Sequence, residues 1–169
     1  QPPEKKPIES SIGIDVGLSS FATISTGEKI NNPRWLKQSE RKLRSLHRRV
    51  SRRKKGSKNR YKAINSLALC YEKVALRRRN FCHQHSTALV RKYDLIAIEK
   101  LNVSGMVRSR FGKSILDAAW AQFTTQLTVK AESAGRQVVF VNARGTSQEC
   151  PDCGAIKSKK IYERIPKTP

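Results

Sequence analysis

Two short stretches are the most informative about the architecture: residues 11–17, which read Ser-Ile-Gly-Ile-Asp-Val-Gly, and residues 95–99, which read Leu-Ile-Ala-Ile-Glu. Both are apolar runs of strand length, and each contains one acid, Asp15 in the first and Glu99 in the second. An acid inside an apolar strand is costly unless it binds a cation or another partner. Adjacent strands lie about 5 Å apart. The sequence therefore predicts that Asp15 and Glu99 share a cation if their strands are neighbours.

The overall charge predicts the class of partner. The chain of 169 residues carries 35 Lys and Arg against 13 Asp and Glu, a net charge of +22. Nucleic acid is the expected partner of so basic a protein. An anionic membrane surface is the weaker alternative, because the most basic stretch lacks a bulky apolar face. No apolar run is long enough to cross a membrane. Four cysteines without a disulfide-type spacing favour a reduced, intracellular setting.

The pattern of apolar residues predicts five strands and three long helices. The strands are expected at residues 11–17, 20–25, 28–31, 94–99 and 137–142. Residues 38–93 form an insertion of two helices with narrow apolar stripes, joined at residues 54–59 into an antiparallel hairpin. One further helix is predicted from Ser114 to Gly135, with Ser114 and Asp117 spaced as a capping box.

These elements predict one α/β domain with a mixed sheet over residues 11–145. Residues 1–10 contain three prolines and are expected to be a linker, and a chain that begins with Gln is expected to be a fragment. Residues 146–169 are polar and irregular around Cys150 and Cys153. Three strands followed by helix–strand crossovers resemble the ribonuclease H arrangement, whose first strand carries the first metal-binding acid.

The acid pair suits a magnesium site for cutting phosphodiesters. Magnesium prefers anionic oxygen ligands, and a two-metal site activates water and stabilises the leaving oxygen. Two alternatives remain open: Asp15 as an aspartate at a strand end, and Glu99 as a partner of Lys100. A third carboxylate is usually needed. The acids after Asn142 all lie in the cysteine arm, and Asp117 is explained as a helix-start acid, so the chain is expected to lack this ligand.

The cysteine arm reads as half of a zinc site. The spacing Cys150-x-x-Cys153-Gly154 presents two thiolates to one zinc ion, whereas a redox pair would need a helix N-terminus beside a strand. Cys70 and Cys82 lie too far apart on one helix to complete the site. Cys82, His83 and His85 are interpreted as packing residues. The half site is expected to bind zinc weakly.

The hairpin is the most basic part of the chain. Fourteen Lys or Arg and one acid, Glu40, lie between Arg34 and Lys62, which gives a net +13 over 29 residues. Such a stretch supplies salt-dependent, sequence-independent affinity for phosphates. RNA binding of the kind seen in ribosomal proteins would explain the charge, although it would not explain Asp15 and Glu99. The candidate nucleic-acid contacts are Arg48, Arg49, Arg52, Arg53, Lys54, Lys55, Lys58 and Arg60.

Seven motifs resemble one family, the transposon-encoded TnpB or OrfB proteins, which are ancestral to type V CRISPR effectors. They are Gly13-Ile14-Asp15-Val16-Gly17-Leu18, Phe21-Ala22-Thr23, Asn32-Pro33-Arg34, residues 51–60, Ile98-Glu99-Lys100-Leu101-Asn102-Val103, Ala118-Ala119-Trp120 and Thr146-Ser147-Gln148-x-Cys150-x-x-Cys153-Gly154. The resemblance implies a RuvC-type ribonuclease H fold and magnesium-dependent DNA cleavage directed by a guide RNA. It also implies that Asp15 and Glu99 are the first two catalytic acids, that Cys150 and Cys153 begin a zinc ribbon, and that the protein acts in a prokaryotic cytoplasm.

The sequence also departs from this family. Members continue to a second Cys pair and to a helix that carries the third catalytic acid, and they possess amino-terminal regions that hold the guide RNA. This chain is therefore expected to be a RuvC core truncated at both ends, with little cleavage of its own. The alternatives are a non-catalytic nucleic-acid binder, such as an RNA partner or a repressor of its own element, and an untranslated relic.

Overall fold

The computed structural model describes residues 7–142, and all structural statements below concern that part of the chain. A five-stranded sheet has the order β3-β2-β1-β4-β5, in which β1 to β3 are antiparallel and β4 and β5 run parallel to β1. The strands are β1 Ser11–Val16, β2 Ser20–Ile24, β3 Lys29–Asn31, β4 Leu95–Glu99 and β5 Gln137–Val141. The α/β class and all five predicted strands are confirmed.

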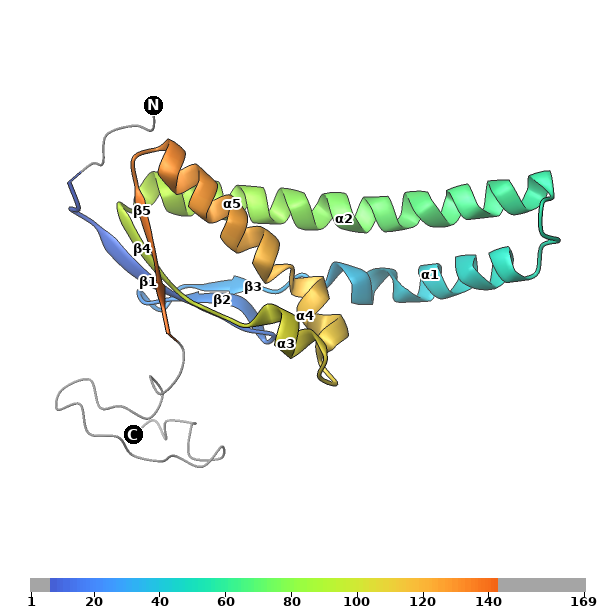
Figure 1. Cartoon of the computed structure of the whole chain (residues 1–169), viewed down its shortest axis with the longest axis horizontal. Helices are drawn as coiled ribbons and strands as arrows, with labels where there is room; N and C mark the ends of the chain where they lie inside the picture. Colours follow the sequence, from blue (N-terminus) through green and yellow to red (C-terminus); the bar gives the residue numbers. More distant parts are fainter. Residues whose placement is uncertain (1–6, 143–169) are drawn as a thin grey trace.

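Five helices accompany the sheet (Figure 1). They are α1 Trp35–Ser51, α2 Lys58–Lys92, α3 Val103–Val107, α4 Gly112–Ala118 and α5 Trp120–Ser133. The second half of α2 and α5 lie against the sheet, while α1 and the first half of α2 project from it as a long hairpin. The predicted helical hairpin is therefore confirmed. The proposed linker up to residue 6 and the cysteine arm, including Cys150 and Cys153, lie outside the described residues.

The hydrophobic core lies between one face of the sheet and the helices α2 and α5. Alternate residues of β1 and β4, among them Ile14 and Ile98, are buried in it. Phe21 of β2 makes edge-to-face contacts with Phe81 of α2 and Phe123 of α5, at ring-centroid distances of 4.9 and 5.1 Å. The strand period of two directs the intervening residues to the opposite face. Asp15 and Glu99 are among those residues.

Two predictions about residues 114–135 are wrong. The single helix is broken at Ala119, whose φ of 57° and ψ of 37° are left-handed and end α4 before α5 begins. Alanine is the strongest helix former, so the sequence carries no local signal for this break. Asp117 also does not cap its own helix. It lies at the end of α4 and accepts hydrogen bonds from the backbone amides of Leu36 and Lys37, which begin α1.

The starts of β1, β4 and β5 are held together by Asp94, a buried acid. Its carboxylate accepts hydrogen bonds from the Ser10 amide and hydroxyl, at 2.9 and 2.7 Å, and forms an ion pair with Arg136. Ser10 immediately precedes β1, and Arg136 immediately precedes β5. These contacts fix the parallel register of the three strands at the end opposite to Asp15 and Glu99.

Candidate metal site and nucleic-acid interface

Asp15 and Glu99 lie on neighbouring strands and face the same side of the sheet. Strands β1 and β4 pair in parallel with Ile14 opposite Ile98, and both of these side chains are buried under the helices. Continuing this register by one residue brings Asp15 beside Glu99 on the other face. Paired strands lie about 4.8 Å apart. The structure therefore brings together the two acids that the sequence singled out.

The electrostatics of the pair agree with this proximity. Burial raises the pKa of the Glu99 carboxyl above its ordinary value, and the negative charge of Asp15 raises it further. Asp15 is exposed, whereas Glu99 is half-buried. Two neighbouring carboxylates are a suitable donor set for a hard divalent cation. The cation relieves the repulsion between the negative charges, and it replaces the stabilisation by water that Glu99 loses on burial.

A small pocket adjoins Glu99 at the end of β4. It has a volume of about 290 Å³ and is bounded by Val16, Lys100 and Phe140 together with the start of α5. Trp120, which opens α5, is buried in its wall, and the indole Nε1 of Trp120 has no hydrogen-bond partner in the described part of the chain. The left-handed backbone of Ala119 places Trp120 at this position. No sequence pattern indicated the pocket.

The alternative interpretation of Glu99 as a partner of Lys100 gains no support, whereas the interpretation of Asp15 as a strand-end aspartate stays open, because Asp15 lies one residue before the end of β1. Within residues 7–142, Glu99 forms no ion pair with Lys100, and no cluster of three His, Cys, Asp or Glu side chains is present. Asp117 is held elsewhere by Arg78, whose guanidinium donates to it at 2.8 and 3.0 Å. The remaining acids considered for a third ligand, Glu149, Asp152 and Glu163, lie outside the described residues.

Cys82, His83 and His85 of α2 do not form a metal site in the described part of the chain. Cys82 is 1% exposed in the core, and burial raises the pKa of its thiol to about 11. A thiol with so high a pKa remains protonated and is a poor metal ligand. His85 packs against the ring of Phe81 at 4.3 Å, and His83 is exposed. The interpretation as packing residues is confirmed for Cys82 and His85, and it is wrong for His83, which is exposed.

The predicted nucleic-acid contacts lie at the tip of the hairpin. Arg48 and Arg49 are in the last turn of α1, and Lys58 is the first residue of α2. Residues 52–55 lie in the loop that connects the two helices. All are exposed except Arg60. Arg60 also has a structural role, because its guanidinium donates to the carbonyls of Val50 and Arg53 at 2.9 and 3.2 Å and thereby closes the loop.

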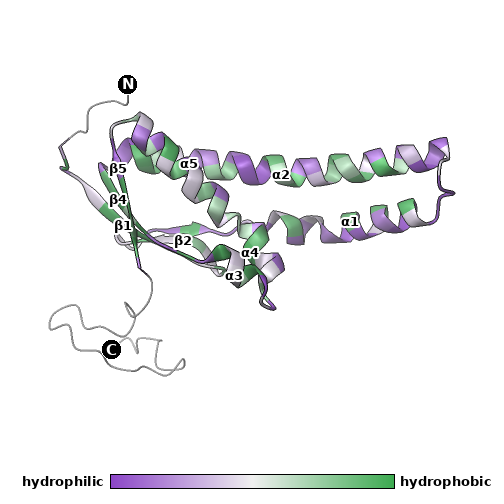
Figure 2. Ribbon diagram, viewed as in Figure 1, coloured by the Kyte–Doolittle hydropathy of each residue, from purple (hydrophilic) through white to green (hydrophobic). Residues whose placement is uncertain are grey.

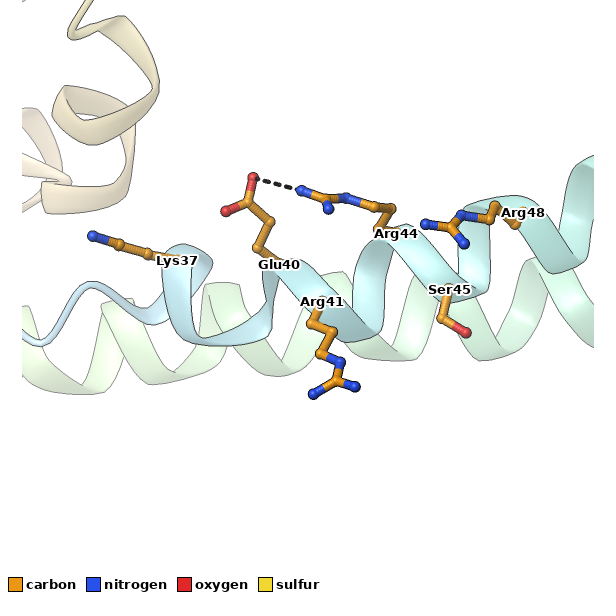
Figure 3. Close-up of a pocket in the computed structure, with 6 residues that line it drawn as sticks. All are labelled: Lys37, Glu40, Arg41, Arg44, Ser45 and Arg48. Carbon is orange, nitrogen blue, oxygen red and sulfur yellow. Dashed lines mark ion pairs between the residues drawn. The ribbon is translucent and has the colours of Figure 1, made fainter.

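The basic surface extends further along α1 than the sequence-based candidates. A groove of about 620 Å³ runs beside α1 and is lined by Lys37, Arg41, Arg44 and Arg48. Figure 3 shows Lys37, Arg44 and Arg48 on one side of the helix. Their spacing of seven and four residues was a readable signal for one helix face. The positively charged surface therefore continues from the tip of the hairpin towards the sheet.

The single acid of this stretch holds α1 to the core domain. Glu40 pairs with Arg44 on its own helix at 3.9 Å and with Lys113 of α4. The hydrogen bond from Lys113 lowers the pKa of Glu40 below its ordinary value, with smaller contributions from the nearby cations Arg44 and Lys37. Glu40 therefore remains ionised at neutral pH. Its single negative charge is outnumbered by the four cations that line the groove, so the groove stays positively charged.

Comparison with known proteins places the chain in a family. Residues 1–110 match the family model OrfB_IS605, described as a probable transposase, and residues 120–168 match the model of the Cas12f1-like TNB domain. The first match spans more than half of the sequence. The chain belongs to the OrfB_IS605 family. The resemblance to TnpB and OrfB proteins inferred from the motifs is thereby confirmed.

Relatives of the OrfB_IS605 chain carry consistent names. A Streptomyces pristinaespiralis protein named "Putative RNA-guided DNA endonuclease" is 36% identical over 152 residues, covering 89% of this chain and 38% of the relative. The similarly named InsQ of Escherichia coli is 32% identical over 164 residues, covering 88% and 41%. The chain thus spans about two fifths of the length of these relatives.

A solved structure shows the same fold. The Cas12f1 chain in a cryo-EM structure of a complex with single guide RNA and target DNA superposes with a TM-score of 0.63 and 20% identity. The match covers 96% of this chain and 35% of the Cas12f1 chain.

Within residues 7–142, none of the helices combines the length and the apolar character needed to cross a membrane.

Proposed function

We propose that this chain forms the RuvC-type, ribonuclease H-like nuclease domain of a TnpB-like endonuclease that cuts DNA under the direction of a guide RNA. Asp15 and Glu99 hold magnesium, and the hairpin binds the nucleic-acid backbone. The observation that carries the proposal is the in-register pairing of β1 and β4, which sets the two acids side by side. Family membership and the names of the relatives support the same activity.

The division of labour follows from the charges. When bound, magnesium supplies a Lewis acid that activates water and stabilises the leaving oxygen of a phosphodiester. Asp15 and Glu99 supply anionic oxygens from two rigid strands, so their separation is fixed before the ion arrives. The cations of α1 and of the hairpin tip hold the phosphate backbone through contacts that do not depend on sequence.

Two carboxylates are a sparse ligand set for a two-metal site. We therefore expect the 169-residue polypeptide alone to bind magnesium weakly and to cleave DNA slowly or not at all. Clear magnesium-dependent nicking of single-stranded DNA by this polypeptide, abolished by Asp15→Ala, would contradict that expectation. The cysteines Cys150 and Cys153 are proposed as half of a zinc site, and the match to the Cas12f1-like TNB domain covers both.

Manganese binding tests the metal site without requiring cleavage. Mn²⁺ has the same preference for oxygen ligands and can be titrated by electron paramagnetic resonance. Loss of an outer-shell partner already costs about 10–100-fold in metal affinity, so we expect Asp15→Asn and Glu99→Gln each to lose at least about tenfold. Glu132→Gln, an exposed acid on α5, is the matched control and should bind like the parent. Equal affinity in all four proteins would refute the site.

A second function, a non-catalytic nucleic-acid binder, is favoured by the charge of the hairpin. It predicts that salt-sensitive DNA or RNA binding persists in Asp15→Ala and Glu99→Ala. The two functions separate when the hairpin and the acids are varied independently. If the acid variants keep both nucleic-acid affinity and Mn²⁺ affinity, the binder is the better description. If the acid variants lose Mn²⁺ affinity and keep nucleic-acid affinity, the nuclease domain is the better description.

A further inference from the structure

A second pocket lies between the first turn of α1, the β1–β2 turn and the start of α4. It has a volume of about 360 Å³, and its wall includes Leu18, Asn32, Arg34, Lys37 and Phe111. Leu18 follows the end of β1 by two residues, so the pocket lies close to the end of the strand that carries Asp15. The basic row of α1 begins at Lys37, in the wall of the same pocket.

Phe111 is the unusual member of this wall, because 48% of this large apolar side chain is exposed. Its backbone is rigidly held: the Phe111 amide donates to the Ser109 hydroxyl at 3.2 Å, and the Gly112 amide donates to the Ser109 carbonyl at 2.9 Å. A β-carbon at position 112 would collide with the carbonyl oxygen of Val107, so only glycine permits this close turn. The turn thus fixes the backbone that carries the half-exposed Phe111 ring.

Three cations lie beside the ring or in the wall of the pocket. The guanidinium of Arg110 lies over the ring of Phe111, 4.8 Å from its centroid. Arg34 and Lys37 contribute to the pocket wall, and both are exposed. The acid in the wall, Asp117, already accepts hydrogen bonds from Arg78 and from the start of α1, so its charge is compensated.

We propose that Phe111 stacks on an unpaired base of single-stranded nucleic acid while Arg34, Lys37 and Arg110 contact the flanking phosphates. Aromatic rings beside a cationic groove are the common device for binding single strands, because every base has a π-face. A base in a duplex is stacked on both sides and cannot reach the ring. The pocket therefore selects single-stranded over double-stranded segments at the entrance to the Asp15 edge. This inference rests on the proposed function for the identity of the ligand.

Binding of two single-stranded probes tests this site. One probe is a 12-residue oligothymidylate, and the other is a 12-residue abasic oligomer with the same phosphates and no bases. Affinities of the full chain are measured in EDTA, so that metal binding and cleavage play no part. Phe111→Ala should weaken oligothymidylate binding between about fivefold and 150-fold, the range that one stacked base gives. Its affinity for the abasic oligomer should be unchanged, and Phe111→Trp should bind oligothymidylate at least as well as the parent.

The matched control is Leu116→Ala, which removes an apolar side chain that is 56% exposed on α4 and does not line the pocket. It should bind both probes like the parent. Phe111→Ala with unchanged oligothymidylate affinity, or with equal losses for both probes, would overturn the proposal. So would an equal loss in Leu116→Ala. Failure of the Mn²⁺ site would leave this measurement intact, and failure here would leave the metal site intact.

Discussion

The two parts of α2 have different environments, although they form one continuous helix of 35 residues. From Cys82 onwards, α2 buries Cys82, Ser86, Leu89 and Val90 in the core. Before that point it buries only Ala63 and Val74, and its partner α1 buries only Leu43. Figure 2 shows mostly apolar strands β1 and β4, whereas hydrophilic and hydrophobic residues alternate along α1 and α2. Apolar burial stabilises the core domain, whereas the hairpin depends on a few buried side chains and a few polar contacts.

The largest effect should come from the core. Phe123→Ala removes a ring that is 0% exposed and breaks the contact with Phe21, which should cost about 3–5 kcal/mol of unfolding free energy. Leu43→Ala in the hairpin should cost about 2 kcal/mol. Urea unfolding measures the first difference. Hydrogen exchange should show that the second accelerates exchange in α1 and the first half of α2 only, and uniform acceleration would mean that the two regions unfold together.

The next effect should come from the junction between the two regions. Asp117→Ala leaves Arg78 without its carboxylate and the first amides of α1 without an acceptor. Loss of one partner of a buried pair together with a cap should cost about 2–4 kcal/mol, less than for a fully buried pair because Arg78 is partly exposed. Glu40→Gln, which breaks the exposed contacts with Lys113 and Arg44, should lower the unfolding free energy much less, because solvent screens both ion pairs. Similar costs for both variants would show that Asp117 is not the main attachment of the hairpin.

The hairpin charges should matter for binding more than for folding. Replacing Arg48, Arg52 and Arg53 together by Gln should reduce the slope of log affinity against log salt by about 2–3, since each phosphate contact contributes about 0.7–0.9. Replacing three exposed cations outside the tip, Lys29, Arg79 and Arg91, is the control of equal charge. A filter-binding series in increasing salt measures both slopes. Equal slopes would show that binding responds to total charge and not to the hairpin tip.

The smallest effect should come from the acid pair in the absence of metal. A folded-state pKa of Glu99 above its ordinary value of 4.5 means that the folded protein holds this proton more tightly than the unfolded chain. The unfolding free energy therefore falls as the pH rises from 4.5 through the raised pKa. Glu99→Gln removes this loss, so it should be slightly more stable than the parent at neutral pH. Urea midpoints at pH 4.5 and 7 measure the difference, which should be larger at pH 7. A parent that gains stability over this range relative to Glu99→Gln would contradict the assignment.

Local patterns predicted most of the fold, and long-range contacts explain the rest. The β1 and β4 strands were readable because apolar residues surround a single acid in each. The break at Ala119 was not readable, because alanine favours a continuous helix. The role of Asp117 was missed because its carboxylate binds an amide 81 residues away in sequence, and no local spacing encodes that contact. The proximity of Asp15 and Glu99 was predicted from strand order, whereas their metal binding and the role of Cys150 and Cys153 remain predictions.

The ionisation of Glu99 is the most direct test of a cation shared by these two acids. Carbon-13 nuclear magnetic resonance of the side-chain carboxyl can follow its titration in the parent and in Asp15→Asn, with and without Mg²⁺. We predict a pKa of Glu99 above the ordinary value without metal, a decrease of this pKa in Asp15→Asn, and a decrease in the parent when Mg²⁺ is added. A Glu99 titration that responds neither to the loss of the Asp15 charge nor to Mg²⁺ would contradict the shared site.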